Sequence, residues 1–200
     1  MIRQQFLRCS GLAIAITLLL QVSTVSAESS MPASQVAAEW TAKQDIAVLQ
    51  RRYAQATDMI AADSAGNEAK VVSIYQTIFT EDAEMGVLDQ LTLEGPMLWL
   101  ELVKTTFVPL SNAQHMIGSQ VVEIQSLPDE QGHGGAATMR SYVQATHVNK
   151  DGTLERVLGT YISTAIYLPD SGWKLSKMTL EILSTEAAKM APPLQLDEPE

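Results

Sequence analysis

The sequence predicts an α+β fold in which N-terminal helices cover one face of a curved antiparallel sheet. Between positions 43 and 106, apolar residues recur every three or four residues, which is the spacing of amphipathic helices. After position 109, long runs rich in β-branched residues are separated by turn signals, which is typical of strands joined by hairpins. A strongly bent sheet covered by helices forms a cone, and we expect a pocket in its open mouth.

The first 27 residues have the layout of a secretory signal peptide. Arg3 and Arg8 precede a short apolar run at residues 12–20, and Val25-Ser-Ala27 forms a small-residue cleavage site. The alternative is an uncleaved anchor, but the apolar run is shorter than the roughly 18–20 residues of a membrane-spanning helix. We therefore expect an exported protein, periplasmic or secreted, without a membrane partner after cleavage.

Charge and cysteine content exclude some classes of function. The formal net charge is −10, and loss of residues 1–27, which carry two arginines and no acidic residue, would leave −12. Nucleic acid is not an expected partner, because phosphate contacts need clustered lysines and arginines. Cys9, the single cysteine, lies in the predicted leader, so the mature chain can form neither a disulfide nor a cysteine-based zinc site.

Three helices are expected ahead of the long strands. The spacing of Ile46, Leu49 and Tyr53 predicts the first, which follows a flexible, polar and alanine-rich lead-in at residues 28–42. A break at 63–67 separates it from the second, and Gly95-Pro96 opens the third because proline fits the first turn of a helix. The predicted helices are residues 43–60, 68–79 and 97–106, with a short strand at 83–88.

Four strands follow, separated by segments with turn or loop composition. Lys150-Asp-Gly152 is a hairpin signal, Pro169 to Gly172 is a second turn, and the glycine-rich stretch at 128–135 is a loop. The predicted strands are residues 115–125, 136–149, 154–168 and 173–183. The folded domain is expected to cover residues 43–186, followed by a disordered, proline-rich and acidic tail at 187–200.

Two of the three histidines are placed to reach a cavity. Alternation along the second long strand puts its smaller and more apolar side chains on one face, which we expect to be the concave one: Met139, Ser141, Val143, Ala145 and His147. His115 opens the preceding strand, so antiparallel pairing would bring His115 and His147 to one end of the sheet. His133 lies in a glycine-rich loop and is expected to be solvated.

The residues alone leave the roles of these side chains open. A histidine at a strand end is more often a hydrogen-bonded structural group than a catalyst. At about 100° per residue, Asp58 lies roughly opposite the side of the first helix that carries Ile46 and Leu49. It shares its side with small residues, and periodicity predicts a solvated carboxylate.

Four stretches in order resemble the SnoaL-like group of the nuclear transport factor 2-like superfamily. They are Tyr53-Ala-Gln-Ala-Thr-Asp58, Ile78-Phe-Thr-Glu-Asp-Ala-Glu84, Ala113-Gln-His-Met-Ile-Gly118 and Ser171-Gly-Trp-Lys-Leu-Ser-Lys177. They resemble that group's first-helix motif, its helix-to-strand junction, its histidine-bearing strand and its last strand. Together they span most of residues 43–184.

This resemblance implies a cone-shaped α+β barrel and a set of site residues. The scytalone dehydratase-like and hexachlorocyclohexane dehydrochlorinase-like enzymes of the group use an Asp–His pair in the cavity. Asp58 matches the aspartate, His115 matches the histidine, and His147 matches a second cavity histidine. An imidazole can remove a proton next to a leaving group while a carboxylate fixes its tautomer, so neither a metal nor another cofactor is expected. Pairing of superfamily members through their sheets implies a homo-oligomer.

The chain departs from the pattern at groups that polarise a substrate. Thr57 and Met85 stand where the dehydratase-like pattern has tyrosines, and Ala165 stands where it has an asparagine. Met178 stands where the dehydrochlorinase-like pattern has an arginine. The expected contacts with a substrate are Tyr53, Met85, Ser141, Val143 and Ala165.

The sequence therefore predicts an exported, cofactor-independent lyase or isomerase. Asp58, His115 and His147 would form its catalytic group and act on a small hydrophobic molecule. The alternative is a non-catalytic module with the same fold, which binds a small ligand or serves in assembly.

Overall fold

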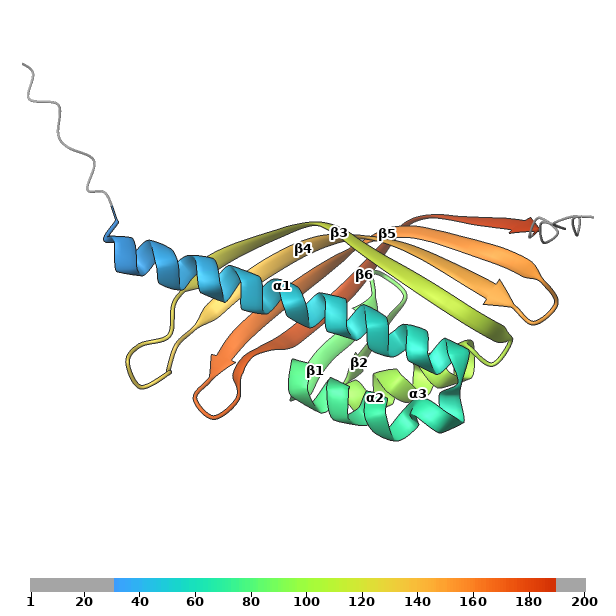
Figure 1. Ribbon diagram of the computed structural model, residues 1–200, viewed down its shortest axis with the longest axis horizontal. Coiled ribbons are helices and arrows are strands. Elements are labelled where there is room, and N and C mark those ends of the chain that lie inside the picture. Colours follow the sequence, from blue (N-terminus) through green and yellow to red (C-terminus); the bar gives the residue numbers. More distant parts are fainter. Residues whose placement is uncertain (1–30, 190–200) are drawn as a thin grey trace, which may run out of the picture. The chain divides into compact units, whose positions relative to one another are not determined.

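The computed structural model describes residues 31–189, which form three helices and one six-stranded sheet (Figure 1). The predicted signal peptide at 1–27 and residues 190–200 of the predicted tail lie outside the described residues. The helices are α1 (Ala33–Ala62), α2 (Ser64–Ile78) and α3 (Pro96–Thr106). The strands are β1 (Phe79–Val87), β2 (Leu91–Glu94), β3 (Leu110–Ser126), β4 (Ala136–Asn149), β5 (Thr153–Leu168) and β6 (Gly172–Lys189).

The sheet has the order β2-β1-β6-β5-β4-β3 and is antiparallel except where β1 runs parallel to β6. The α+β class is thereby confirmed. The four long strands follow each other as hairpins, and β4 begins and ends at the predicted residues. The turn from β4 to β5 needs Gly152, whose φ of +81° favours a residue without a side chain.

The main differences from the sequence-based expectation lie at the ends of the domain, at the expected break and in one added strand. Residues 64–67 of the expected break at 63–67 belong to α2, because the side chain of Asp63 caps the helix by accepting the N–H of Gly66. The helix α1 begins at Ala33, so most of the expected flexible lead-in is helical, because Ala42 is buried and Glu39 pairs with Lys43 one turn later. Strand β6 continues to Lys189, inside the expected tail, because it pairs with β5 as far as Thr153. The short strand β2 was not expected, since four residues are too few for a clear alternation pattern.

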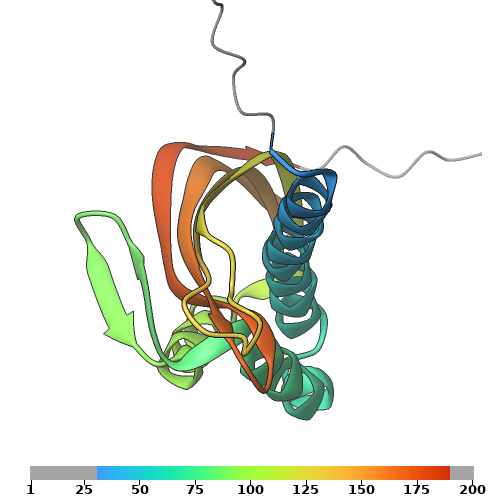
Figure 2. The ribbon, with the colours of Figure 1, turned by 90° about the vertical axis from the view of Figure 1, so that its left-hand side faces the viewer.

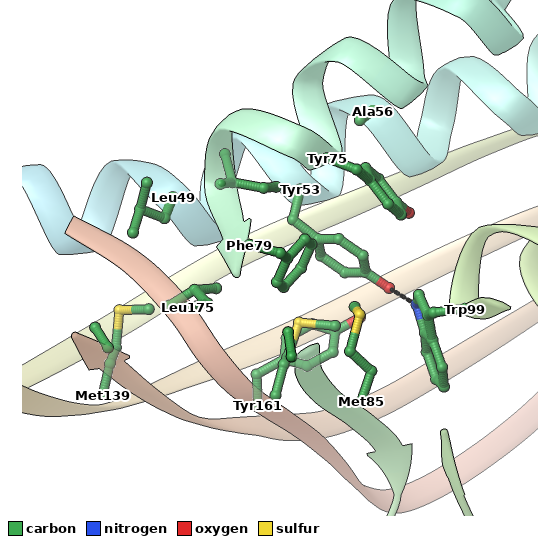
Figure 3. Packing of buried hydrophobic residues seen from close by; sticks show 14 of the residues in the cluster. Leu49, Tyr53, Ala56, Tyr75, Phe79, Met85, Trp99, Met139, Tyr161 and Leu175 are labelled. Carbon is green, nitrogen blue, oxygen red and sulfur yellow. Dashed lines mark hydrogen bonds between the residues drawn. The ribbon is translucent and has the colours of Figure 1, made fainter. Parts of the chain in front are cut away.

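The helix α1 and the concave face of the sheet enclose most of the core. Figure 2 shows the sheet curling from β6 towards β3, with α1 lying along the side that the curve leaves open. Tyr53 from α1 packs at ring distances of 5.8 Å against Tyr75, Phe79 and Tyr161, which come from three other elements (Figure 3). Aromatic packing of this kind fixes α1 on the sheet and thereby sets the position of every later residue of the helix.

The expected alternation along β4 is present. Met139, Ser141, Val143 and Ala145 are buried on the concave face, whereas Tyr142 on the convex face is 59% exposed. Within residues 31–189, no helix combines the length and the apolar character needed to cross a membrane.

Candidate functional site

A cavity of about 200 Å³ lies between the concave face of the sheet and helices α1 and α3. Most of its wall is apolar and includes Leu102 and Val103 of α3, Val157 of β5 and Leu180 of β6. Ile182 also lines the cavity and is 41% exposed, so the cavity is open to solvent. An apolar pocket with a few polar groups is the usual form of a small-molecule site.

Asp58 and His115 form a hydrogen-bonded pair at this cavity. The Oδ1 atom of Asp58 lies 2.6 Å from Nδ1 of His115, and the backbone N–H of His115 donates to Oδ2 of Asp58 over 3.1 Å. The His115 side chain is 6% exposed and lines the cavity, and the Asp58 side chain is 25% exposed. The two contacts hold the ring in one orientation, and Nδ1 is the nitrogen that faces the carboxylate.

The expectation of a solvated Asp58, drawn from helical periodicity, is wrong. Asp58 does lie away from the main apolar stripe of α1, on the side that carries Ala54 and Ala61. That side is also covered, because β3 packs along α1, and both alanines are buried. The small side chains let β3 approach closely enough for His115 to meet Asp58.

His147 lies beside His115, with 5.6 Å between the ring centroids. Register explains this, because His115 pairs with Ala145 and His147 pairs with Ala113 on neighbouring strands. The Nε2 atom of His147 is buried and has no hydrogen-bond partner among residues 31–189. Its Nδ1 atom lies 3.7 Å from a carboxylate oxygen of Glu155, which is too long for a good hydrogen bond.

Burial lowers the pKa of His147, and the neighbouring His115 lowers it further, against an opposing effect of Glu155. His147 is therefore neutral at pH 7. Phe107 packs against both imidazoles, at 5.2 Å from the ring of His147 and 6.4 Å from that of His115. The two imidazoles thus lie in an apolar setting, with Asp58 facing His115 and Glu155 facing His147.

A second polar group in the cavity wall is formed by tyrosines. The hydroxyl of Tyr53 accepts a 2.9 Å hydrogen bond from Nε1 of Trp99 (Figure 3), and Tyr161 lines the same cavity. Trp99, Phe107 and Tyr161 belong to the cavity wall but were not predicted to do so. Their spacing is that of ordinary core residues, so no signal in the sequence distinguishes them from packing residues.

The candidate substrate contacts divide into two sets. Tyr53 and Val143 lie in the cavity wall. Met85, Ser141 and Ala165 are buried and do not line this cavity, so their contact with a substrate stays a prediction. Met85 is enclosed by the aromatic core (Figure 3), and Ser141 lies further along β4, where Gln120 fills the space beneath α1. Ala165 lies deeper still along β5, opposite Leu175.

The remaining histidine and the acidic residues give no further site. His133 is in the loop before β4, with its side chain 68% exposed, as expected. Among the residues that the structure describes, no group of three or more histidine, cysteine or acidic side chains is arranged to hold a metal ion.

A comparison with known families agrees with the fold. A family model described as a SnoaL-like domain matches residues 38–179. The chain belongs to the SnoaL-like domain family. No curated protein sequence matches the chain.

Several solved structures share the fold. One is a protein from Novosphingobium aromaticivorans assigned as a scytalone dehydratase, with 17% identity, a TM-score of 0.61, and coverage of 82% of this chain and 99% of that one. Another is a type 3 hexachlorocyclohexane dehydrochlorinase from Novosphingobium barchaimii, with 18% identity, a TM-score of 0.61, and coverage of 79% and 99%. A protein from Kribbella flavida is 22% identical, with a TM-score of 0.60 and coverage of 74% and 95%. At these identities the likeness shows the nuclear transport factor 2-like fold.

Proposed function

We propose that this SnoaL-like chain is a cofactor-independent lyase or isomerase that removes a proton from a small, mostly apolar substrate. The observation that carries the proposal is the 2.6 Å contact between Asp58 and His115 at the wall of an open cavity. A histidine oriented by a carboxylate is the usual arrangement for a general base. The names of two structural neighbours, a dehydratase and a dehydrochlorinase, support elimination chemistry in this fold.

The proposed step uses the two ring nitrogens of His115 differently. With Nδ1–H donating to Asp58, Nε2 carries a lone pair and can accept a proton from a substrate carbon. The electron pair of the broken C–H bond forms a new C=C bond. In an elimination, the pair of the neighbouring bond leaves with the leaving group. In an isomerisation, the pair of a neighbouring double bond shifts to the far atom of that bond, and this atom then takes the proton from His115.

The surroundings of the pair favour this step. The imidazolium formed on His115 gains the attraction of Asp58 in a partly dry site, where an ionic interaction is stronger than in water. The neutral His147 beside it adds no opposing charge, and its buried Nε2 can bond to a polar group of the substrate. We assign His147 the role of a second acid/base or binding group.

The test is proton exchange on a panel of small ketones, alcohols and chlorinated hydrocarbons in D₂O, followed by NMR. The purified chain is expected to exchange or eliminate at least one of them, and His115→Gln is expected to lose the rate by about 10²–10⁴-fold. His133→Gln is the matched control, because His133 is an exposed loop histidine. An unchanged rate in His115→Gln would remove His115 as the base.

The second candidate is a binding module without catalysis. The predominance of apolar side chains in the cavity wall favours it, since such a wall holds a small hydrophobic ligand without chemistry. In that case native mass spectrometry would detect a bound molecule, and His115→Gln would retain it while no compound of the panel reacts.

A further inference from the structure

The cavity wall contains a hydroxyl group that the Asp58–His115 pair does not use. Tyr53 is 2% exposed, lines the cavity and accepts the Nε1–H of Trp99 over 2.9 Å. Trp99 lines the cavity as well, from the facing helix α3. Two residues far apart in the sequence therefore meet at one point of the wall.

The direction of this hydrogen bond is set by chemistry. An indole nitrogen can only donate, so the oxygen of Tyr53 must be the acceptor. The O–H of Tyr53 is not used in that bond and can donate to another atom. The hydroxyls of Thr57 and Tyr161 lie close enough to affect the pKa of Tyr53, so a substrate oxygen competes with them for this O–H. A hydroxyl that already accepts a hydrogen bond is also polarised, which strengthens its own donation in a low-dielectric setting.

The hydroxyl stays protonated near neutral pH. Burial raises the pKa of Tyr53, and the hydrogen bond from Trp99, with the neighbouring hydroxyls of Thr57 and Tyr161, only opposes this rise. Burial and the neighbouring Tyr53 raise the pKa of Tyr161 as well. Both phenols therefore stay neutral at physiological pH, and a neutral buried phenol is suited to bind a hydrogen-bond acceptor.

We propose that Tyr53, held in place by Trp99, binds an oxygen atom of the substrate in the cavity that His115 also lines. This inference rests on the proposed function and names its substrate class. The substrates are small, mostly apolar molecules that carry a carbonyl or hydroxyl oxygen close to an acidic C–H. Trp99 acts through Tyr53 and is a positioning residue.

Size and polarity agree with this class. A cavity of about 200 Å³ is smaller than the roughly 300–1,000 Å³ of pockets for drug-sized ligands, so it fits a molecule of one or two rings. The apolar wall holds the rings, and the oxygen pairs with Tyr53. A hydrocarbon or a chlorinated hydrocarbon without oxygen would leave the hydroxyl unpaired, which selects against it.

The test compares two probes of nearly the same shape, acetophenone and α-methylstyrene, which differ by C=O in place of C=CH₂. Dissociation constants are measured by ligand-observed NMR titration, without turnover. The wild-type chain is expected to prefer acetophenone by about 5–10-fold, the ratio that one net hydrogen bond provides. Tyr53→Phe is expected to reduce this preference to less than about twofold.

Two further variants complete the design. Tyr142→Phe removes an equally large hydroxyl from the exposed convex face and is expected to keep the full preference. Trp99→Phe leaves Tyr53 in place but removes its donor, and is expected to lower the preference about two- to threefold. Trp99→Phe also keeps the proposal testable if Tyr53→Phe does not fold. If Trp99 had only a structural role, Trp99→Phe would lower the affinity for both probes equally and leave the preference for acetophenone unchanged.

The outcomes separate this inference from the proposed function. A wild-type chain that binds both probes equally, or binds neither, overturns the role of Tyr53. A preference that persists in Tyr53→Phe overturns it as well, while a loss of exchange in His115→Gln would still support the proton transfer. Loss of the preference in Tyr53→Phe together with an unchanged rate in His115→Gln would keep the oxygen-binding site and reject His115 as the base.

Discussion

Replacing Asp58 by asparagine tests the central pair without changing its shape. The two oxygens of Asp58 have separate partners, Nδ1 of His115 at 2.6 Å and the backbone N–H of His115 at 3.1 Å. Asparagine keeps one acceptor oxygen and replaces the other by an NH₂ group. The oxygen can still accept the backbone N–H, and the NH₂ group then faces Nδ1 of His115, so the charge-assisted hydrogen bond to Nδ1 is lost whichever tautomer the ring adopts.

The size of the effect follows from these contacts. A hydrogen bond to a charged group contributes about 1.5–3 kcal/mol, and Asp58 is only a quarter exposed. Loss of one such bond is expected to lower the free energy of unfolding by about 2 kcal/mol. For a domain of this length, that corresponds to a fall in Tm of about 4–8 °C.

The measurement is urea denaturation of the wild-type chain and Asp58→Asn, followed by tryptophan fluorescence. Glu155→Gln is the matched control, because Glu155 faces His147 at 3.7 Å and is half-exposed. Surface pairs of this kind contribute about 0–1 kcal/mol, so the control is expected to stay within 1 kcal/mol of the wild type. A change for Asp58→Asn no larger than that for Glu155→Gln would refute the reasoning that the pair is a strong, partly buried contact.

Further predictions concern pH, packing, assembly and processing. Burial lowers the pKa of His147 below its usual 6.5, so the unfolded chain binds more protons than the folded chain just below pH 6.5. The free energy of unfolding should therefore fall as the pH falls through this range, and it should fall less in His147→Asn, as measured by urea melts at several pH values. Gly86→Ala would place a Cβ atom 2.2 Å from the carbonyl oxygen of Leu91, which should cost about 1–3 kcal/mol in the same melts. Leu183 is 81% exposed on the convex face, through which we expect the chain to self-associate. Leu183→Glu should therefore show a lower molecular mass than the wild type in light scattering, and an unchanged mass would count against self-association through this face. Export predicts a mature chain that begins at Glu28, and mass spectrometry of the secreted or periplasmic protein would detect an intact leader if this is wrong.

Local patterns in the sequence determined the elements and one face of the sheet. Two-residue alternation identified the inner face of β4, and turn chemistry located the hairpin at Gly152, because both depend only on neighbouring residues. The placement of His115 and His147 at one end of the sheet followed from antiparallel register alone. The motif resemblance added Asp58, which periodicity had placed in solvent.

Tertiary structure decided what surrounds these residues. Asp58 meets His115 because β3 packs on the alanine side of α1, a contact between segments 57 residues apart in the chain. Trp99 meets Tyr53 across 46 residues, and Met85 fills the aromatic core although its strand borders the cavity. Side-chain periodicity tells which face of an element is apolar but not which partner covers it, because the partner is set by the packing of the whole sheet against the helices. The histidines and the sheet could therefore be predicted from the sequence, whereas the cavity and its tyrosine–tryptophan contact could not.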